Sequence, residues 1–185
     1  MISSEQLVGL KTELSIKAKN GIDFIISACI VWLAISVIWY LPFDSYNKSV
    51  LTFIVGGFML PMALLMSKLL KTQWKVDNNP LQPLGLWLNF AQLFYFPFLI
   101  FILIKMPSHF AMTYAIITGA HLFPYAWFYN EKAYAVGAGL ISVGSLILGL
   151  TLDTEKLYFI PLVVAILLLL LALPLAMSYR KKVHK

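Results

Sequence analysis

The sequence predicts an all-α polytopic membrane protein with six transmembrane helices and both termini in the cytoplasm. Three observations predict this class. Hydrophobic residues make up 61% of the 185-residue chain and charged residues only 12%, whereas a soluble domain is roughly 45–50% apolar and about 25% charged. The apolar residues form six long runs, and the basic residues gather on one side of them. Because these runs use nearly the whole chain, no room is left for a separate soluble catalytic domain.

Each apolar run is long enough to cross a bilayer, since a hydrocarbon core about 30 Å thick needs roughly 20 helical residues. Backbone groups in that core must bond within the segment, which favours helices. The expected spans are residues 22–43, 49–70, 84–104, 110–129, 133–150 and 158–179. The chain then divides into an N-terminal cytoplasmic segment 1–21, a six-helix bundle 22–179 and a basic cytoplasmic tail 180–185.

The segment before the first span has the pattern of a short helix. Ser3 and Gln6 have the spacing of a capping box, and three leucines then fall on one helix face, at Leu7, Leu10 and Leu14. An amphipathic helix lying in the membrane interface and a frayed tail both fit this pattern. Charged residues interrupt the segment, so it lacks the apolar centre of a secretion signal.

The orientation follows from the lysines and arginines, which accumulate on the cytoplasmic side of membrane proteins. With six spans, one face of the membrane receives eleven of them: Lys11, Lys17, Lys19, Lys68, Lys71, Lys75, Lys132, Arg180, Lys181, Lys182 and Lys185. The other face receives three, at Lys48, Lys105 and Lys156. The asymmetry places both termini in the cytoplasm. It also indicates anionic lipid headgroups as partners and argues against nucleic acid, because the charge forms a one-sided girdle beside the bilayer.

The fourth span carries a polar stripe along one side of its helix. Its members recur at intervals of three or four residues, at Tyr114, Thr118, His121 and Tyr125. Lipid would not solvate such a face, so we expect it to look into the bundle. His121 is the strongest functional candidate, because ionisable residues inside a membrane are rare and usually functional and an imidazole can change charge near neutral pH.

The third span offers a second polar set, Asn89, Gln92 and Tyr95, in its cytoplasmic half. Gln92 and His121 lie about equally deep, so the two side chains could face each other. Together with the stripe of the fourth span, these residues form a seven-member candidate ligand-binding site. The structural alternative, which applies most strongly to the amides and to Thr118, is that they only hold helices together.

Other residues near the spans have expected structural roles. Pro61, Pro97 and Pro124 each remove a helix hydrogen bond from the carbonyl four residues earlier, at Gly57, Leu93 and Ala120. Small residues in the fifth span predict close helix packing. The sixth span is almost wholly apolar and is expected to face lipid. Asp23 is expected at the interface, and four aromatic residues near span ends are expected to anchor there: Trp39, Tyr40, Trp74 and Trp127.

Several chemistries are excluded or disfavoured by the residues available. The single cysteine, Cys29, allows no internal disulfide and no CxxC site. A zinc site needs more donors than one membrane histidine supplies, since His109 and His184 lie outside the spans. No serine lies in a nucleophile motif and no phosphate-binding glycine loop is present. We therefore assign no catalytic and no metal-ligating residues, leave the cofactor unassigned, and consider an enzyme less favoured than a binding protein.

Two stretches carry a resemblance to known proteins. "KNGIDFIISACIVWLAISVIWYLPF" and "GAHLFPYAWFY" resemble an uncharacterised bacterial family of six-span membrane proteins known only as a domain of unknown function. This resemblance implies a multi-pass protein of the bacterial cytoplasmic membrane and transfers no activity. The chain is also similar in architecture to the substrate-binding subunits of energy-coupling-factor vitamin transporters. However, "GIDFIISACIVWLAIS" lacks the Ala-xxx-Ala docking signature of their first span.

Three functions remain open. The leading hypothesis is a bundle that binds, and could transport, a small lipophilic or weakly polar solute between the first, third and fourth spans. The second is a non-catalytic interaction or regulatory protein, for which a second copy of the chain is one candidate partner. The third is an intramembrane enzyme acting on lipid or quinone.

Overall fold

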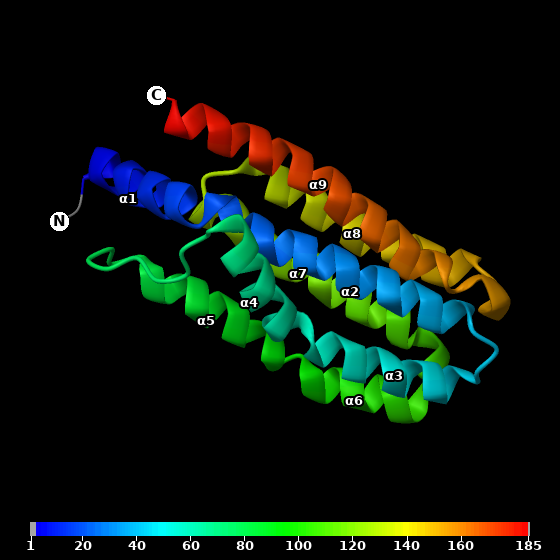
Figure 1. Ribbon diagram of the computed structural model, residues 1–185. Helices are drawn as coiled ribbons and strands as arrows, with labels where there is room; N and C mark the ends of the chain where they lie inside the picture. The colour runs from blue at the N-terminus through cyan, green and yellow to red at the C-terminus, as the bar shows by residue number, and fades with distance from the viewer. Residues whose placement is uncertain (1–2, 185) are drawn as a thin grey trace.

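The computed structural model describes residues 3–184, and within that range every regular element is helical (Figure 1). Residues 1, 2 and 185 of the expected terminal segments, Lys185 included, lie outside the described residues. The α-helices are α1 (Ser4–Lys17), α2 (Ile22–Tyr40), α3 (Ser45–Gly57), α4 (Met59–Leu70), α5 (Gln82–Leu93), α6 (Phe96–Lys105), α7 (Phe110–Phe128), α8 (Lys132–Thr151) and α9 (Phe159–Val183). The short 3₁₀ helices are η1 (Lys19–Gly21), η2 (Pro107–His109) and η3 (Thr154–Lys156).

The chain runs six times along the long axis of the bundle, as α2, α3 with α4, α5 with α6, α7, α8 and α9. Both described chain ends lie at the same end of the bundle, which we call the terminal end (Figure 1). Within residues 3–184, five of these passes are long and apolar enough to cross a membrane: Lys19–Tyr40, Ser45–Leu70, Gln82–Lys105, Lys132–Thr151 and Thr154–Val183. The chain is therefore a membrane protein.

The remaining pass, α7, is fourth in chain order and is not among these five. Its mean hydropathy is lower than that of the five passes, and it packs against α8, α9, α5 and α6. A helix enclosed by other helices needs less apolar surface than one that faces lipid. The expected count of six crossings therefore depends on α7.

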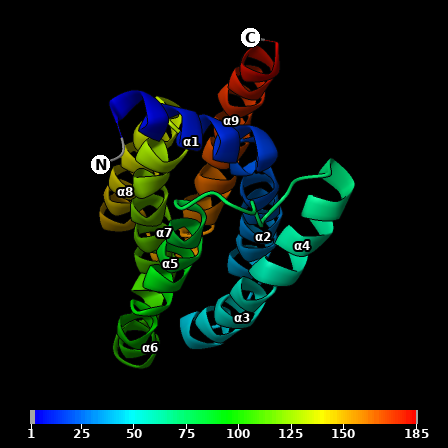
Figure 2. The ribbon, with the colours of Figure 1, turned by 90° about the vertical axis from the view of Figure 1, so that its left-hand side faces the viewer.

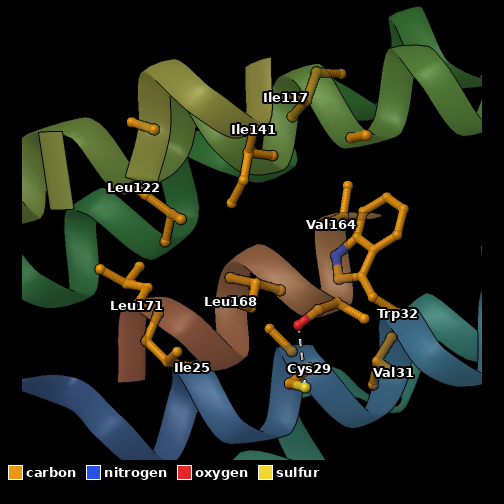
Figure 3. Packing of buried hydrophobic residues seen from close by; sticks show 14 of the residues in the cluster. Ile25, Cys29, Val31, Trp32, Ile117, Leu122, Ile141, Val164, Leu168 and Leu171 are labelled. Atoms are coloured by element: carbon orange, nitrogen blue, oxygen red, sulfur yellow. Dashed lines mark hydrogen bonds between the residues drawn. The ribbon is translucent and has the colours of Figure 1, made fainter. Parts of the chain in front are cut away.

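The hydrophobic core lies between α2, α7, α8 and α9 (Figure 3). Ile35, Ile141, Val164 and Leu168 are fully buried there. The Cys29 thiol donates to the Ala165 carbonyl oxygen over 3.4 Å and is a packing residue. The expectation that the sixth span faces lipid is wrong for one side of α9, because eight of its residues, Ile160 through Leu175 at helical spacing, are buried against α2 and α8.

The helices α7 and α8 approach closely because small residues line their contact. A Cβ atom added at Gly119 would lie 2.5 Å from Ser142 Oγ and 2.8 Å from its backbone nitrogen. Ser142 Oγ in turn donates to the Ile116 carbonyl oxygen over 3.3 Å. Ala138 and Ser145 of α8 are buried on the same stripe. The fifth span thus has the packing role that its small residues predict.

Two passes are interrupted midway. The second breaks between α3 and α4 at Phe58, three residues before Pro61, and the third breaks at Phe94 and Tyr95, before Pro97. Both interruptions fall where a proline leaves a carbonyl without its helical donor. The third proline, Pro124, lies inside the continuous helix α7. The broken passes touch each other through α3 and α6, whereas α4 and α5 diverge toward the terminal end (Figure 2).

The loop between α4 and α5, residues 71–81, is fixed to the terminal end. The Gln73 amide donates to the Lys17 carbonyl oxygen over 3.0 Å. Asn79 Nδ2 donates to the Leu10 carbonyl oxygen over 3.0 Å and to Glu13 Oε2 over 2.9 Å. The loop therefore joins α1 to the two diverging helices.

Candidate ligand-binding site

Tyr114, the first residue of the polar stripe of α7, packs against the second pass close to its break. The Tyr114 ring centroid lies 5.2 Å from that of Trp32 on α2. On α3, a Cβ atom added at Gly56 would lie 2.7 Å from the Tyr114 hydroxyl. Gly56 is the residue before the last one of α3. Tyr114 therefore occupies space that is open only because this position is a glycine.

His121 lies further along the stripe and is half-buried. Its ring centroid is 5.4 Å from that of Tyr125 in an edge arrangement. Tyr125 is buried and stacks on Tyr129 with 5.9 Å between centroids. Thr118, between Tyr114 and His121 along the stripe, is also buried. Three of the four members of the stripe therefore have direct aromatic contacts to other parts of the bundle or to each other.

Helix α5 packs against α7. A Cβ atom added at Gly85 would lie 3.0 Å from Phe128 Cζ, so α5 and α7 approach closely at this point. The two helices are antiparallel (Figure 1). Gln92 lies seven residues after Gly85 on α5, and His121 lies seven residues before Phe128 on α7. By helical spacing we expect the two side chains at similar levels on the faces through which α5 and α7 approach each other.

The remaining candidates differ in their surroundings. Asn89 is half-buried, and its Nδ2 donates to the Gly85 carbonyl oxygen of its own helix over 3.0 Å. Within residues 3–184, the His121 ring and the Gln92 amide form no hydrogen bond with protein groups. Tyr95 lies in the break between α5 and α6 and is 55% exposed. Tyr95 is therefore not brought together with the others.

Two surface hollows lie away from these residues. One, of about 340 Å³, is lined by the α4–α5 loop and the start of α5. The other, of about 100 Å³, lies at the opposite end, beside His109, Met112 and Leu157. Neither is lined by any of the seven candidate residues.

A buried polar cluster at the terminal end was not foreseen from the sequence. Lys182 Nζ pairs with Glu131 Oε1 at 2.5 Å, and both side chains are less than one-fifth exposed. The same ammonium donates to Ser15 Oγ over 2.6 Å and to the Tyr129 carbonyl oxygen over 3.1 Å. Ser178 also donates to Glu131. The cluster joins α1, the end of α7, the start of α8 and the end of α9.

Asn20 extends this cluster into the turn between α1 and α2. Its Nδ2 donates to the Leu175 carbonyl oxygen over 2.8 Å, and its own carbonyl accepts the Tyr134 hydroxyl over 2.6 Å. Asn20 has a positive φ of 58°, a conformation that asparagine tolerates better than most residues. Gly21 follows with φ of 71°, and a Cβ atom there would lie 3.0 Å from the Tyr129 ring. Asn20 and Gly21 therefore suit this turn for two reasons. Both adopt a positive φ, and the Tyr129 ring leaves little room for a side chain at Gly21.

Asp23 lies beneath the α4–α5 loop and is 1% exposed. Its Oδ2 accepts the Thr72 hydroxyl over 2.6 Å and the Trp74 indole N–H over 2.7 Å. The Trp74 ring stacks on Phe24 with 4.9 Å between centroids. Asp23 lies in the first turn of α2, and the loop covers its carboxylate and supplies its hydrogen bonds.

Two ionisable groups of α1 have altered pKa values. Hydrogen bonds from Lys17 and Asn79 lower the pKa of the Glu13 carboxyl. Burial lowers the pKa of Lys11, whose ammonium lies 3.5 Å from the centre of a Trp127 ring. Lys11 is only 8% exposed. The helix α1 therefore packs on the bundle through a cation as well as through its apolar residues.

The fold and these contacts define an all-helical membrane protein with a polar stripe inside its bundle. The chain belongs to a family of unknown function (DUF7010), whose model matches residues 7–178. No curated protein and no solved structure matches the chain.

Proposed function

We propose that the protein binds a small lipophilic or weakly polar solute between α5 and α7, and that binding serves the transport of this solute. The proposal includes six crossings with both termini in the cytoplasm of a bacterial cell. The observation that carries it is that the His121 ring and the Gln92 side-chain amide, on two helices in contact, form no hydrogen bond with protein groups within residues 3–184. Polar groups in a membrane interior that have no protein partner are available to a ligand.

The interrupted passes support the same location. Broken helices within a membrane are tolerated where the free backbone is buried in protein or lines a cavity, and in transporters they form substrate sites. The break at Phe58 lies near the α7 stripe, because Tyr114 packs against Gly56. The aromatic side chains of the stripe suit a flat or apolar ligand, which Gln92 and His121 would orient through hydrogen bonds.

Photolabelling tests the proposal. The full-length protein in lipid vesicles is exposed to a diazirine-bearing alkyl alcohol at pH 5 and pH 8, and labelled peptides are identified by mass spectrometry. We expect labelling of residues around Gln92 and His121 at both pH values, because both side chains can form hydrogen bonds with the alcohol. His121→Ala should reduce labelling at this position severalfold.

The matched control is Phe123→Ala, on the same helix but 63% exposed. This variant should label like the wild type at both pH values. If His121→Ala retains the wild-type pattern, or if label is found only on outward-facing residues of α8 and α9, the proposed site is wrong.

A further inference from the structure

At one corner of the terminal end, Lys19 contacts two residues that directly precede other cations in the sequence. Lys19 Nζ in η1 donates to the Leu70 carbonyl oxygen, at the end of α4, over 2.8 Å. The same ammonium lies 5.4 Å from the centre of the Tyr179 ring on α9. Lys71 directly follows Leu70 and Arg180 directly follows Tyr179, and both are exposed. We call Lys19, Lys71 and Arg180 the basic corner.

The basic corner differs from three other cations at the same end. Three of those are paired with a carboxylate: Lys17 with Glu13 at 3.1 Å, Lys75 with Asp77 at 3.4 Å and Lys182 with Glu131 at 2.5 Å. Within the part of the chain that the structure describes, the three cations of the basic corner form no ion pair. Asp23, although close in sequence to Lys19, is covered by Thr72 and Trp74. The corner thus presents positive charge that the protein itself does not neutralise.

An apolar stripe of α2 leads away from the basic corner. The helix α2 packs against α4 on one side and α9 on the other, and it lies between them (Figures 1 and 2). Ile30, Leu33 and Val37 recur at three- and four-residue intervals and are 38%, 44% and 61% exposed. This face therefore looks outward between its two neighbours. Since α2 begins directly after η1, the stripe runs into the membrane from the level of Lys19.

We propose that the basic corner binds the headgroup of an anionic phospholipid whose acyl chain lies along the outward stripe of α2. Charge complementarity selects this occupant. The Arg180 guanidinium can donate two parallel hydrogen bonds to phosphate oxygens, and Lys71 adds a mobile ammonium. Lys19 uses one of its three N–H groups on the Leu70 carbonyl, which leaves two for the headgroup. This site is separate from the α5–α7 site and does not depend on the function proposed for it.

Native mass spectrometry of the full-length protein tests this inference. The detergent-solubilised protein is titrated with phosphatidylglycerol and, separately, with phosphatidylcholine of the same acyl length. We expect the first bound lipid to be phosphatidylglycerol with clear preference. The variant Lys71→Gln/Arg180→Gln should weaken that binding about 25-fold, because each basic residue near an anionic surface contributes about fivefold to affinity. Lys19 is left unchanged because it also holds α4 to η1.

The matched control is Lys75→Gln/Lys132→Gln, which removes two exposed cations from the same end of the bundle. This variant should retain the wild-type preference. An equal loss in both variants would show a diffuse attraction and overturn the site, as would equal binding of the two lipids by the wild type. Competition by inorganic phosphate at the lipid concentration would also overturn the inference, since it would show that the acyl chain contributes nothing. Melting temperatures matching the wild type confirm that the variants are folded.

Discussion

Lys182 shows how one buried charge can hold several helices together. Its ammonium contacts Glu131, Ser15, Asn20 and the Tyr129 carbonyl, which come from two segments far from Lys182 in the chain. A buried ion pair is not by itself strongly stabilising, because both charges lose their hydration. Removing one partner is costly, however, since the other charge then remains buried and uncompensated.

We therefore expect Lys182→Met to lower the free energy of unfolding by about 3–5 kcal/mol. The double variant Glu131→Gln/Lys182→Met should recover part of this loss, because it leaves no uncompensated charge. Unfolding by sodium dodecyl sulfate in mixed micelles measures both values. The control, Lys156→Met, removes a pair of 3.6 Å to Asp153 in which both side chains are more than half exposed. It should change stability by about 0.5 kcal/mol or less; equal losses in the control and in Lys182→Met would contradict this account.

Residues whose environment depends on distant segments were the hardest to predict. Trp39 lies near a span end and was expected to anchor at the interface, but it is 2% exposed and donates to Thr52 Oγ1 over 2.9 Å. Asp23 was likewise expected at the interface and lies beneath a loop some fifty residues away. Composition places such residues near a membrane boundary. It does not reveal which other helix or loop covers them.

At the scale of single elements, local signals were sufficient. The capping box of Ser3 and Gln6 is present at the start of α1, with both reciprocal hydrogen bonds formed. The breaks before Pro61 and Pro97 follow from missing amide protons, which is a property of the residue itself. The small residues of α8 similarly identify the face that packs against α7. These features were predictable because each depends on residues within one or two helical turns.

The close contact of α7 and α8 makes Gly119 intolerant of a side chain. Its Cβ would lie 2.8 Å from a backbone nitrogen of α8, which cannot move without shifting the helix. Gly119→Ala should therefore destabilise the protein by about 1–3 kcal/mol, a typical cost of overpacking. The same unfolding assay in mixed micelles measures the loss.

The control is Gly139→Ala, on the partner helix α8, where an added Cβ meets nothing within 4 Å. Alanine is the better helix former by roughly 1 kcal/mol, so this variant should be neutral or slightly stabilising. A Gly119→Ala variant as stable as Gly139→Ala would mean that the two helices are less closely packed than described.

At the scale of the whole molecule, hydropathy predicted the bundle but not the arrangement of its candidate site. The apolar runs recur as helical passes because burial in lipid depends on composition. The polar stripe of α7 was predicted from spacing alone, and its contacts with Trp32 and Gly56 are consistent with an inward orientation. Tyr95 shows the limit of this reasoning, because a kink at Pro97 changes the face on which a preceding residue lies.

The topology depends on α7, whose 19 residues span about 28 Å at 1.5 Å per residue, close to the thickness of the hydrocarbon core. Its lower hydropathy is compatible with crossing because α8, α9, α5 and α6 pack against it. If α7 crosses, Met106 and Lys132, which flank it, lie on opposite sides of the membrane. Single cysteines placed at these positions in a Cys29→Ala background should report this difference. A membrane-impermeant maleimide applied to intact cells should label Met106→Cys, whereas Lys132→Cys should react only after permeabilisation.

The controls are Lys48→Cys and Lys75→Cys, on either side of the second pass. Lys48→Cys should behave like Met106→Cys, and Lys75→Cys should behave like Lys132→Cys. Labelling of Met106→Cys and Lys132→Cys from the same side would leave five crossings and separate the two termini across the membrane. The interpretation of the α7 stripe as an intramembrane site would then fail, because its residues would no longer lie at membrane depth.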